Sequence, residues 1–574
     1  MNDVLFITPN DKGTLENESI GTLQLATILT SNRIRCRVVP FWSIGTLDNF
    51  TEFLQNTLEL MKVEQPKIVS FYTRCDTYHI VLRMAQYIKR TYPHIYIVCG
   101  GPQSDITAED TICQIPWVDF VCCGEGETTI YPFFASLLQG QPDCSIAGLV
   151  YREGNEVKKN LRPAFIPDLD TLPPIDYSLT DNNQTSDRAF PIDVGRGCPF
   201  ACTFCSTKTF WGRKYRLKSP QRIVEEMQQV HKKYGKTYFN LSHDMFTMNR
   251  KKVIEVCNLI KQLDFPVEWG CSARTDCVDR ELIDIMVDSG LQGIYFGIET
   301  GSPRMQKLIN KNLKLDHAVD LMEYMVSKGL KPVASFIYGF PEETEEDLSQ
   351  TMAMIGEMLA LRNVKVQTHL CAFMVGTELS QKYHADMTPV DFYSDETGNF
   401  AVEECKDLIQ AHPELFQHML EYKTELRSKL RYFSVFFFLW KRIQPVFQYI
   451  SEKYPKDRLI EMYYDFVEAN REVFARLESE PEMQWSALLL KQDKFVSRFS
   501  QDENYELMAD ICRWVASDTW ANIRQETCTD VFCFDPASLK KRIPLQAYPK
   551  CITYATWKDG KITTQVYPMD MLGG

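Results

Sequence analysis

The sequence predicts an α/β protein with three parts: a doubly wound parallel sheet, a second series of β/α units and a mostly α-helical C-terminal region. Short apolar strands alternate with amphipathic helices over residues 1–140, which is the pattern of a parallel sheet buried on both faces. The alternation stops in residues 141–187, starts again over residues 188–394 and gives way to helical patterns over residues 395–574. A chain of 574 residues is also too long for one hydrophobic core.

The first part is expected to be Rossmann-like. Its strands are expected at Val4–Thr8, Ile34–Pro40, Lys67–Tyr72, Ile95–Cys99 and Asp119–Cys123, and its helices at Gly21–Ser31, Phe50–Lys62 and Tyr78–Tyr92. Sheets of this kind bind ligands beyond the C-terminal ends of their strands.

Residues 141–187 are expected to form an irregular linker. They contain Pro163, Pro167, Pro173 and Pro174, and prolines between periodic segments indicate a loop.

The second part is expected to be a partial barrel of about six β/α units, because a closed barrel of this class needs eight. Its strands are expected at Phe190–Val194, Tyr238–Ser242, Val267–Cys271, Gly293–Ile298, Pro332–Tyr338 and Val364–Leu370, and its helices at Pro220–Tyr234, Arg250–Leu263, Arg280–Ser289, Asp316–Ser327 and Glu345–Leu359.

The third part, residues 395–574, is predicted to be helical, with strands only at Cys551–Tyr554 and Ile562–Tyr567. Its most apolar run, Tyr432–Trp440, has about half the length that a membrane span needs. We interpret that run as a buried helix.

Composition narrows the functional classes. The formal net charge of −13 disfavours a nucleic-acid partner, which would need a cationic surface. Met1-Asn2-Asp3 leads directly into an apolar strand, so no export signal and a cytoplasmic location are expected. Nineteen cysteines in such a protein indicate metal chemistry and not a disulfide framework.

One cysteine motif follows the first strand of the second part. Cys198, Cys202 and Cys205 have the spacing C-x3-C-x2-C, in a loop that begins Gly195-Arg196-Gly197. Three thiolates on one loop can each bind one iron of a cubane cluster and leave the fourth iron open. The alternatives are three ordinary buried cysteines or a zinc site, for which the next candidate ligand, His231, lies well downstream.

This loop, with Phe204 before the third cysteine, resembles the signature of radical S-adenosylmethionine enzymes, and the resemblance covers about residues 188–380. It implies a [4Fe–4S] cluster whose open iron binds S-adenosylmethionine and whose electron cleaves it to a 5′-deoxyadenosyl radical. It also implies an external electron donor such as flavodoxin or ferredoxin.

The resemblance further implies S-adenosylmethionine contacts near the strand ends of the second part. The residues are Phe204, Ser242, His243, Asp244, Ser272, Arg274 and Glu299. The family's usual Gly-Gly-Glu is absent, and Ser242-His243-Asp244 stands near its place.

Glycine-rich segments follow two strands of the first part, where glycine lets a backbone approach a flat cofactor. Gly100-Gly101-Pro102-Gln103 and Gly124-Glu125-Gly126-Glu127-Thr128, with Gly21-Thr22-Leu23, resemble cobalamin-binding domains fused to radical S-adenosylmethionine cores. The resemblance implies that these residues, together with Ser70 and Arg74, bind cobalamin. The alternatives are a phosphate site or a domain that keeps the fold without the cofactor.

One departure from that family concerns the cobalt ligand. Some cobalamin domains have Asp-x-His-x-x-Gly after the first strand, whereas Thr8–Gly13 contains no histidine. We expect Arg74 to lie near the cobalt and to block a ligand there.

The resulting functional hypothesis is a cobalamin-dependent radical enzyme that methylates an unactivated carbon of a peptide or natural-product substrate. One alternative is cyclisation, epimerisation or rearrangement without methyl transfer. Another is a cobalamin or iron–sulfur sensor that binds its cofactors without turnover. The sequence predicts no membrane span.

Overall fold

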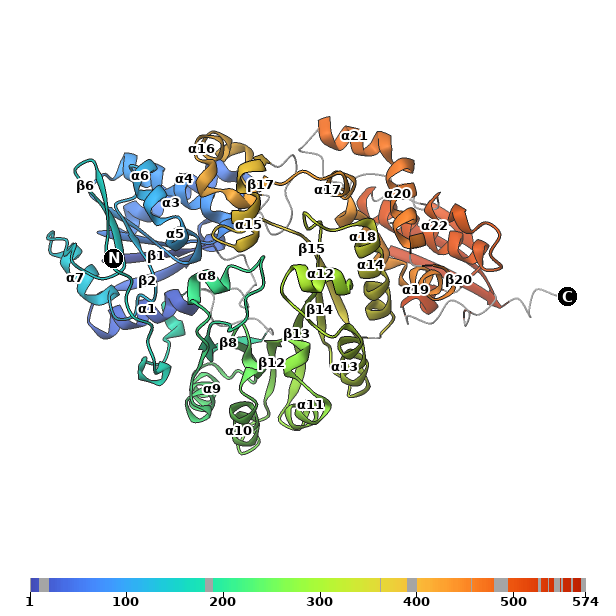
Figure 1. The fold of residues 1–574 in the computed structure, drawn as a ribbon, viewed down its shortest axis with the longest axis horizontal. Coiled ribbons are helices and arrows are strands. Elements are labelled where there is room, and N and C mark those ends of the chain that lie inside the picture. The colour runs from blue at the N-terminus through green and yellow to red at the C-terminus, as the bar shows by residue number, and fades with distance from the viewer. Residues whose placement is uncertain are drawn as a thin grey trace. The chain divides into compact units, whose positions relative to one another are not determined.

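A computed structural model describes residues 2–9, 20–180, 189–361, 363–389, 400–455, 457–479, 494–524, 528–534, 536–540, 548, 551–558 and 561–568. The chain forms two compact units (Figure 1). The first comprises Met1–Phe296, Ile309–Lys311 and Leu370–Tyr422, and the second comprises Gly297–Leu308, Asn312–His369 and Lys423–Gly574.

The N-terminal sheet has seven strands in the order β2-β1-β3-β4-β5-β6-β7. The first five are β1 (Val4–Thr8), β2 (Cys36–Pro40), β3 (Ile68–Tyr72), β4 (Tyr96–Gly100) and β5 (Phe120–Cys122), and they pair in parallel. Helices α1 (Ile20–Ser31), α3 (Phe50–Glu64), α4 (Tyr78–Thr91) and α7 (Ile130–Leu138) lie between or after these strands. The order 2-1-3-4-5 places a topological switch between β1 and β3, where doubly wound sheets bind ligands. The predicted doubly wound fold is confirmed.

Residues 141–187 are not an irregular linker throughout. They contain β6 (Leu149–Glu153) and β7 (Glu156–Lys159), which add an antiparallel hairpin to the edge of the sheet. Gly154 and Asn155 form its two-residue turn, and Gly154 has a positive φ of 61°. A Gly-Asn pair between short strands is a hairpin signal. The charged residues of β7 and the nearby prolines masked it.

The second sheet has the order β15-β14-β13-β12-β11-β8. Its strands are β8 (Phe190–Asp193), β11 (Tyr238–Ser242), β12 (Glu268–Ala273), β13 (Leu291–Glu299), β14 (Val333–Tyr338) and β15 (Lys365–Leu370). The helices between them include α9 (Pro220–Tyr234), α10 (Arg250–Ile260), α11 (Arg280–Val287), α13 (Leu315–Ser327) and α14 (Glu345–Ala360). Strands β8, β11, β12 and β13 pair in parallel. The predicted partial barrel is confirmed.

Residues 400–419, here called the clasp, belong to the first unit and not to a C-terminal domain. The clasp contains η9 (Glu403–Cys405), α16 (Lys406–Ala411), η10 (Pro413–Leu415) and η11 (Gln417–Met419), and α16 lies beside α4 (Figure 1). Its apolar side chains join the core of the N-terminal domain; they are Ala401, Cys405, Leu408, Leu415, Phe416 and Met419. Gln103 Nε2 donates a buried hydrogen bond of 2.8 Å to the Leu415 carbonyl. The expected domain boundary at residue 395 therefore does not hold, because this short helical segment buries its apolar face against α4.

The second unit contains α17 (Glu425–Lys429), α18 (Phe433–Arg442), α19 (Gln444–Lys453), α20 (Asp457–Ala469), α21 (Arg471–Ser479) and α22 (Tyr505–Arg524). It ends in an antiparallel sheet of β18 (Cys528–Phe532), β19 (Cys551–Lys558) and β20 (Lys561–Pro568). The apolar run Tyr432–Trp440 forms most of α18. Phe436 and Trp440 are buried there in a cluster of aromatic rings with Phe447 and Tyr463. No helix in the described ranges is both long and apolar enough to cross a membrane.

The clasp and α4 bury two histidines. Neither ring nitrogen of His418 has a hydrogen-bond partner among the described residues, and His79 bonds the Phe400 carbonyl at 2.8 Å through Nε2 alone. Burial lowers the pKa of His418 to about 3, with a contribution from His79, and burial lowers the pKa of His79 to about 4. Both rings are therefore neutral in the folded protein at neutral pH.

We predict that the clasp loosens in mild acid. In the open state both histidines take up protons near pH 6.5, whereas in the folded state they do so only near pH 3–4, so stability is complete above pH 6.5 and falls as the pH drops toward 4. Hydrogen exchange of amides 400–419, measured from pH 7.5 to pH 5, should show this loss. The substitution His418→Leu should reduce it, whereas His94→Leu, at an exposed histidine, should not. An unchanged acid response in His418→Leu would contradict the explanation.

Candidate functional site

A cavity of about 470 Å³ lies within the first unit, at the C-terminal ends of β1, β3, β4 and β5. Its floor is apolar and includes Phe6, Leu25, Phe71, Val98, Ile130, Phe133 and Leu149. Residues that follow the barrel strands β8 and β11 line the same cavity; they are Gly195, Arg196, Ser242, His243 and Asp244. The cavity is thus shared by the ligand-binding edges of both sheets.

Many of the residues expected to bind cobalamin line this cavity. They are Gly21, Thr22, Ser70, Gly100, Gly101, Pro102, Gly124, Glu125, Gly126 and Glu127. Gly101 and Gly124 have positive φ angles of 103° and 83°, in a region that other residues rarely adopt. A Cβ atom on Gly101 would lie 2.8 Å from the Thr73 carbonyl oxygen, so this glycine is required by the turn itself.

Four other expected residues do not line the cavity. Leu23 is buried in the core, and Thr128 is exposed. Gln103 bonds the clasp. Arg74 donates to Asp76 at 2.7 Å and lies outside the cavity lining, so its expected place beside a bound cobalt gains no support.

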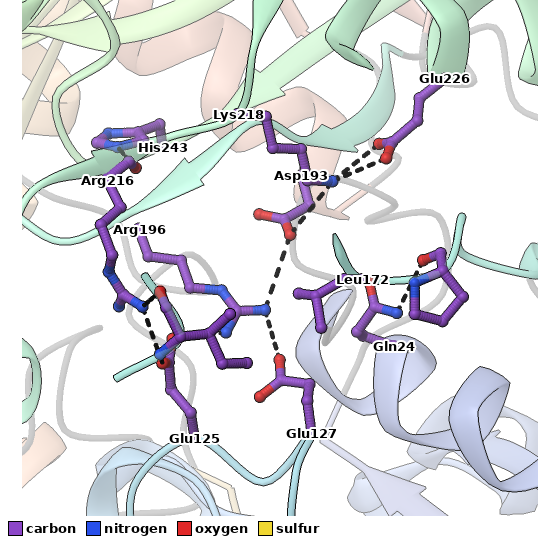
Figure 2. A network of polar contacts seen from close by, with 12 residues as sticks. Gln24, Glu125, Glu127, Leu172, Asp193, Arg196, Arg216, Lys218, Glu226 and His243 are labelled. Atoms are coloured by element: carbon purple, nitrogen blue, oxygen red, sulfur yellow. Dashed lines mark hydrogen bonds and ion pairs between the residues drawn. The ribbon is translucent and has the colours of Figure 1, made fainter. Parts of the chain in front are cut away.

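Glu125 and Glu127 make ion pairs that the sequence did not reveal (Figure 2). Arg196 Nη1 lies 2.7 Å from Glu125 Oε1, and Arg196 Nη2 lies 2.5 Å from Glu127 Oε1. Arg216 Nη1 donates to Glu125 Oε2 at 2.8 Å and to the Ile166 carbonyl at 2.7 Å. Burial opposes ionisation of Glu125, but hydrogen bonds from Arg216 and Arg196 outweigh it and lower the pKa of that carboxyl.

The network continues into the barrel (Figure 2). Asp193, at the end of β8, lies 3.9 Å from Arg196 and 3.6 Å from Lys218. Lys218 pairs with Glu226 of α9 at 2.9 Å. The arginine and lysine residues in segments 195–197 and 216–218 were the sequence feature that could have indicated these ion pairs. The sequence alone does not show which carboxylates they pair with.

The three cysteines lie in the loop after β9 (Gly195–Arg196), which pairs with β10 (Arg216–Leu217). Cys202 is buried, and Cys198 and Cys205 are partly exposed. Burial raises the pKa of Cys198 to about 11, and the neighbouring Cys205, Asp244 and Cys202 contribute to the rise. Bound metal replaces thiol protons, so three neighbouring thiols fit an iron cluster as a donor set.

No three His, Cys, Asp or Glu side chains in the described part of the chain converge as ligands of a single metal ion would. A cubane does not require this, because each thiolate binds a different iron.

Backbone contacts hold the cysteine loop in place. Thr203 donates to the Ile309 carbonyl and accepts from the Leu379 amide, each at 3.0 Å. Gly197 has a φ of 81°, and a Cβ atom there would lie 2.0 Å from the Lys214 carbonyl oxygen. Only glycine fits this close approach.

The residues expected to contact S-adenosylmethionine differ in whether their polar atoms already have hydrogen-bond partners within the protein. Arg274 is buried, stacks on Phe200 at 3.8 Å and bonds Asp276 and the Lys311 carbonyl, but its Nη1 has no partner among the described residues. Both ring nitrogens of His243 are engaged, Nδ1 by the Met245 amide at 2.7 Å and Nε2 by the Arg216 carbonyl at 3.2 Å.

Because burial also lowers its pKa to about 4, His243 is a neutral support of the strand end. Ser242 and Asp244 line the cavity, whereas Phe204 and Ser272 are half-buried outside its lining. Glu299 ends β13 in the second unit with a φ of 71°, a costly backbone conformation that is often found at functional sites.

Comparison with known proteins identifies the family. The model of the radical SAM superfamily matches residues 192–355. An uncharacterized methyltransferase, PH0819, from Pyrococcus horikoshii is 31% identical over 54% of this chain and 68% of its own length. An anaerobic magnesium-protoporphyrin IX monomethyl ester cyclase from Rubrivivax gelatinosus is 29% identical over 47% of this chain. The chain spans only about half of the cyclase, 51%.

A solved structure has a similar fold. The cobalamin-dependent S-adenosylmethionine radical enzyme OxsB, with aqua-cobalamin bound, has a TM-score of 0.61 at 12% identity, and the match covers 90% of this chain and 81% of that one. The resemblance found in the sequence is confirmed: the chain belongs to the radical S-adenosylmethionine superfamily of enzymes, and it has the fold of the cobalamin-dependent enzyme OxsB.

Proposed function

We propose that this protein is a cobalamin-dependent radical S-adenosylmethionine enzyme that transfers a methyl group to an unactivated carbon. One observation carries the proposal: a single cavity is lined both by the glycine turns of the N-terminal sheet and by the strand ends beside the cysteine loop. When bound, the cluster would supply the electron that cleaves S-adenosylmethionine to methionine and the 5′-deoxyadenosyl radical, and cobalamin would supply the methyl group. The superfamily needs a substrate and a reductant, and we propose flavodoxin or ferredoxin as the electron donor.

On the barrel side, Cys198, Cys202 and Cys205 would bind three irons as thiolates. The free Nη1 of Arg274 is a donor suited to a carboxylate or a ribose oxygen of S-adenosylmethionine. Ser242 and Asp244 line the cavity and can accept or donate hydrogen bonds there. Ser272 and Glu299 remain proposals from the family resemblance.

On the N-terminal side, the apolar floor and the turns at Gly100–Pro102 and Gly124–Gly126 fit a flat cofactor with a nucleotide tail. Thr8–Gly13, which contains no histidine, lies mostly outside the described residues. We propose that this stretch supplies no imidazole to cobalt and that the dimethylbenzimidazole tail lies in the sheet crevice.

The similar proteins are named for different types of reaction, so the reaction type of this chain is a proposal. PH0819 is called a methyltransferase and the Rubrivivax protein a cyclase, so a radical reaction without methyl transfer is the second candidate. We propose a peptide or natural-product substrate, since a large helical unit suits an extended molecule.

Replacing Cys198, Cys202 and Cys205 together with alanine should remove the iron–sulfur absorption and all cleavage of S-adenosylmethionine, because the cluster loses its three protein ligands. Iron analysis and assay of 5′-deoxyadenosine would measure both. Replacement of three other cysteines, Cys113, Cys144 and Cys533, is the matched control. A cubane cluster with full iron content in the first variant would contradict the assignment.

Methyl transfer has its own expected signature. With dithionite and S-adenosylmethionine, the reconstituted enzyme should form 5′-deoxyadenosine, and remethylation of cobalamin should add S-adenosylhomocysteine. Formation of 5′-deoxyadenosine alone would favour the cyclase-like alternative. Formation of neither product by a protein loaded with cluster and cobalamin would favour a sensor.

Gly21 offers a direct test of cobalamin uptake. It lines the cavity, and no described atom lies within 4 Å of the place where its Cβ would stand. Gly21→Ala should therefore keep cobalamin uptake. Gly21→Phe should weaken cobalamin binding about 5- to 150-fold, since overfilling costs ~1–3 kcal/mol and 1.4 kcal/mol is tenfold. Bound cobalamin, read from its absorption, should fall in the Phe variant while iron content stays constant. Equal uptake by both variants would place cobalamin elsewhere.

A further inference from the structure

We propose that Arg196 is a positioning residue that fixes the cysteine loop to the Gly124–Glu127 turn, so that the cluster and the cobalamin-type cavity keep one fixed separation. This inference rests on the proposed function and adds a role for a residue outside the cysteine motif. Arg196 directly precedes Gly197 and Cys198 in the chain, and its guanidinium bridges Glu125 and Glu127 (Figure 2).

The bridge is buried, and this burial constrains the position of the cysteine loop. The side chains of Arg196, Glu125 and Glu127 are 8%, 2% and 5% exposed. A buried charge without its partner is strongly unfavourable, so loss of the bridge would leave Glu127 without its ion-pair partner and Glu125 with Arg216 alone. A guanidinium that bonds two carboxylates through separate nitrogens fixes both the distance and the orientation between the loop and the turn.

The same three residues face the cavity, as does Trp211. Arg196 and Arg216 lie over the Trp211 ring, with guanidinium-to-centroid distances of 5.9 and 5.5 Å. Trp211 ends α8 (Thr207–Trp211), the helix that follows Cys205. The bridge and the ring therefore support the cysteine loop on both sides, before Cys198 and after Cys205.

The other charged residues of the network have partners of their own. Glu125 is also paired with Arg216, and Asp193 with Lys218. Neutralising Arg196 and Glu127 together therefore removes one charge of each sign and leaves the other pairs intact. The double variant R196Q/E127Q should fold, whereas Arg196→Gln alone would strand Glu127.

The experiment uses the full-length protein, reconstituted with cluster and hydroxocobalamin and reduced so that cob(II)alamin and the cluster are both paramagnetic. In samples matched for iron and cobalamin content, pulsed dipolar EPR should give one narrow cobalt–cluster separation in the wild type and a broad distribution in R196Q/E127Q. The matched control is R250Q/E281Q, which neutralises an exposed pair of 2.6 Å between α10 and α11 and should keep the narrow separation.

Hydrogen exchange in the cofactor-free protein provides a second readout. Amides 195–205 and 124–130 should exchange at least about tenfold faster in R196Q/E127Q, and not in the control. A narrow separation together with unchanged exchange in R196Q/E127Q would overturn the proposal. If that variant is insoluble, Arg196→Lys replaces it, since a lysine cannot bridge both carboxylates in the same way, and an unchanged result there would overturn the proposal equally.

Failure of the proposed function would look different. A wild-type protein that takes up no cobalamin would remove the EPR measurement and contradict the function, whereas the exchange experiment would still decide the role of Arg196.

Discussion

The pairing of Arg196 with Glu125 and Glu127 is the constraint on which the arrangement of the first unit depends. Each of these charges is buried, and the pairing offsets the cost of burying them. The glutamates belong to the turn after β5, and the arginine belongs to the loop that carries the cysteines. Their pairing therefore brings the ligand-binding edges of two sheets, far apart in the sequence, to one cavity.

The elements that the sequence predicted well are those with a local physical signature. Strands such as β1 and β3 are buried runs of five residues, and α9 begins at an N-cap serine, Ser219, whose side chain accepts from the Arg222 amide. The clasp had no such signature. It pairs with α4, more than 300 positions earlier in the chain, where His79 and Arg83 bond the Phe400 and Glu404 carbonyls. No pattern within residues 400–419 records that pairing.

The site was predictable in its chemistry and less so in its geometry. The spacing of Cys198, Cys202 and Cys205 indicates a cluster because three thiolates on one loop can each bind one iron of a cubane. The glycine turns, predicted to bind cobalamin, line the cavity, but their glycines are present for different structural reasons. Gly101 is required by the close Thr73 backbone, whereas no described atom lies within 4 Å of the Cβ position of Gly21. Glu125 and Glu127 were expected as cofactor contacts, and the structure shows their carboxylates already engaged by arginines.

The cysteine loop has little regular structure of its own, so its shape must come from its neighbours. Thr203 is held on one side by the Ile309 carbonyl and on the other by the Leu379 amide, and Asn310 donates to the Ala201 carbonyl at 2.9 Å. Residues 309–311 and 370–389 come later in the chain but belong to the same compact unit as the loop. Arg196 adds the N-terminal domain as a further support. A cluster held by three ligands keeps an open iron only if its loop does not rearrange to supply a fourth, and these supports provide that rigidity.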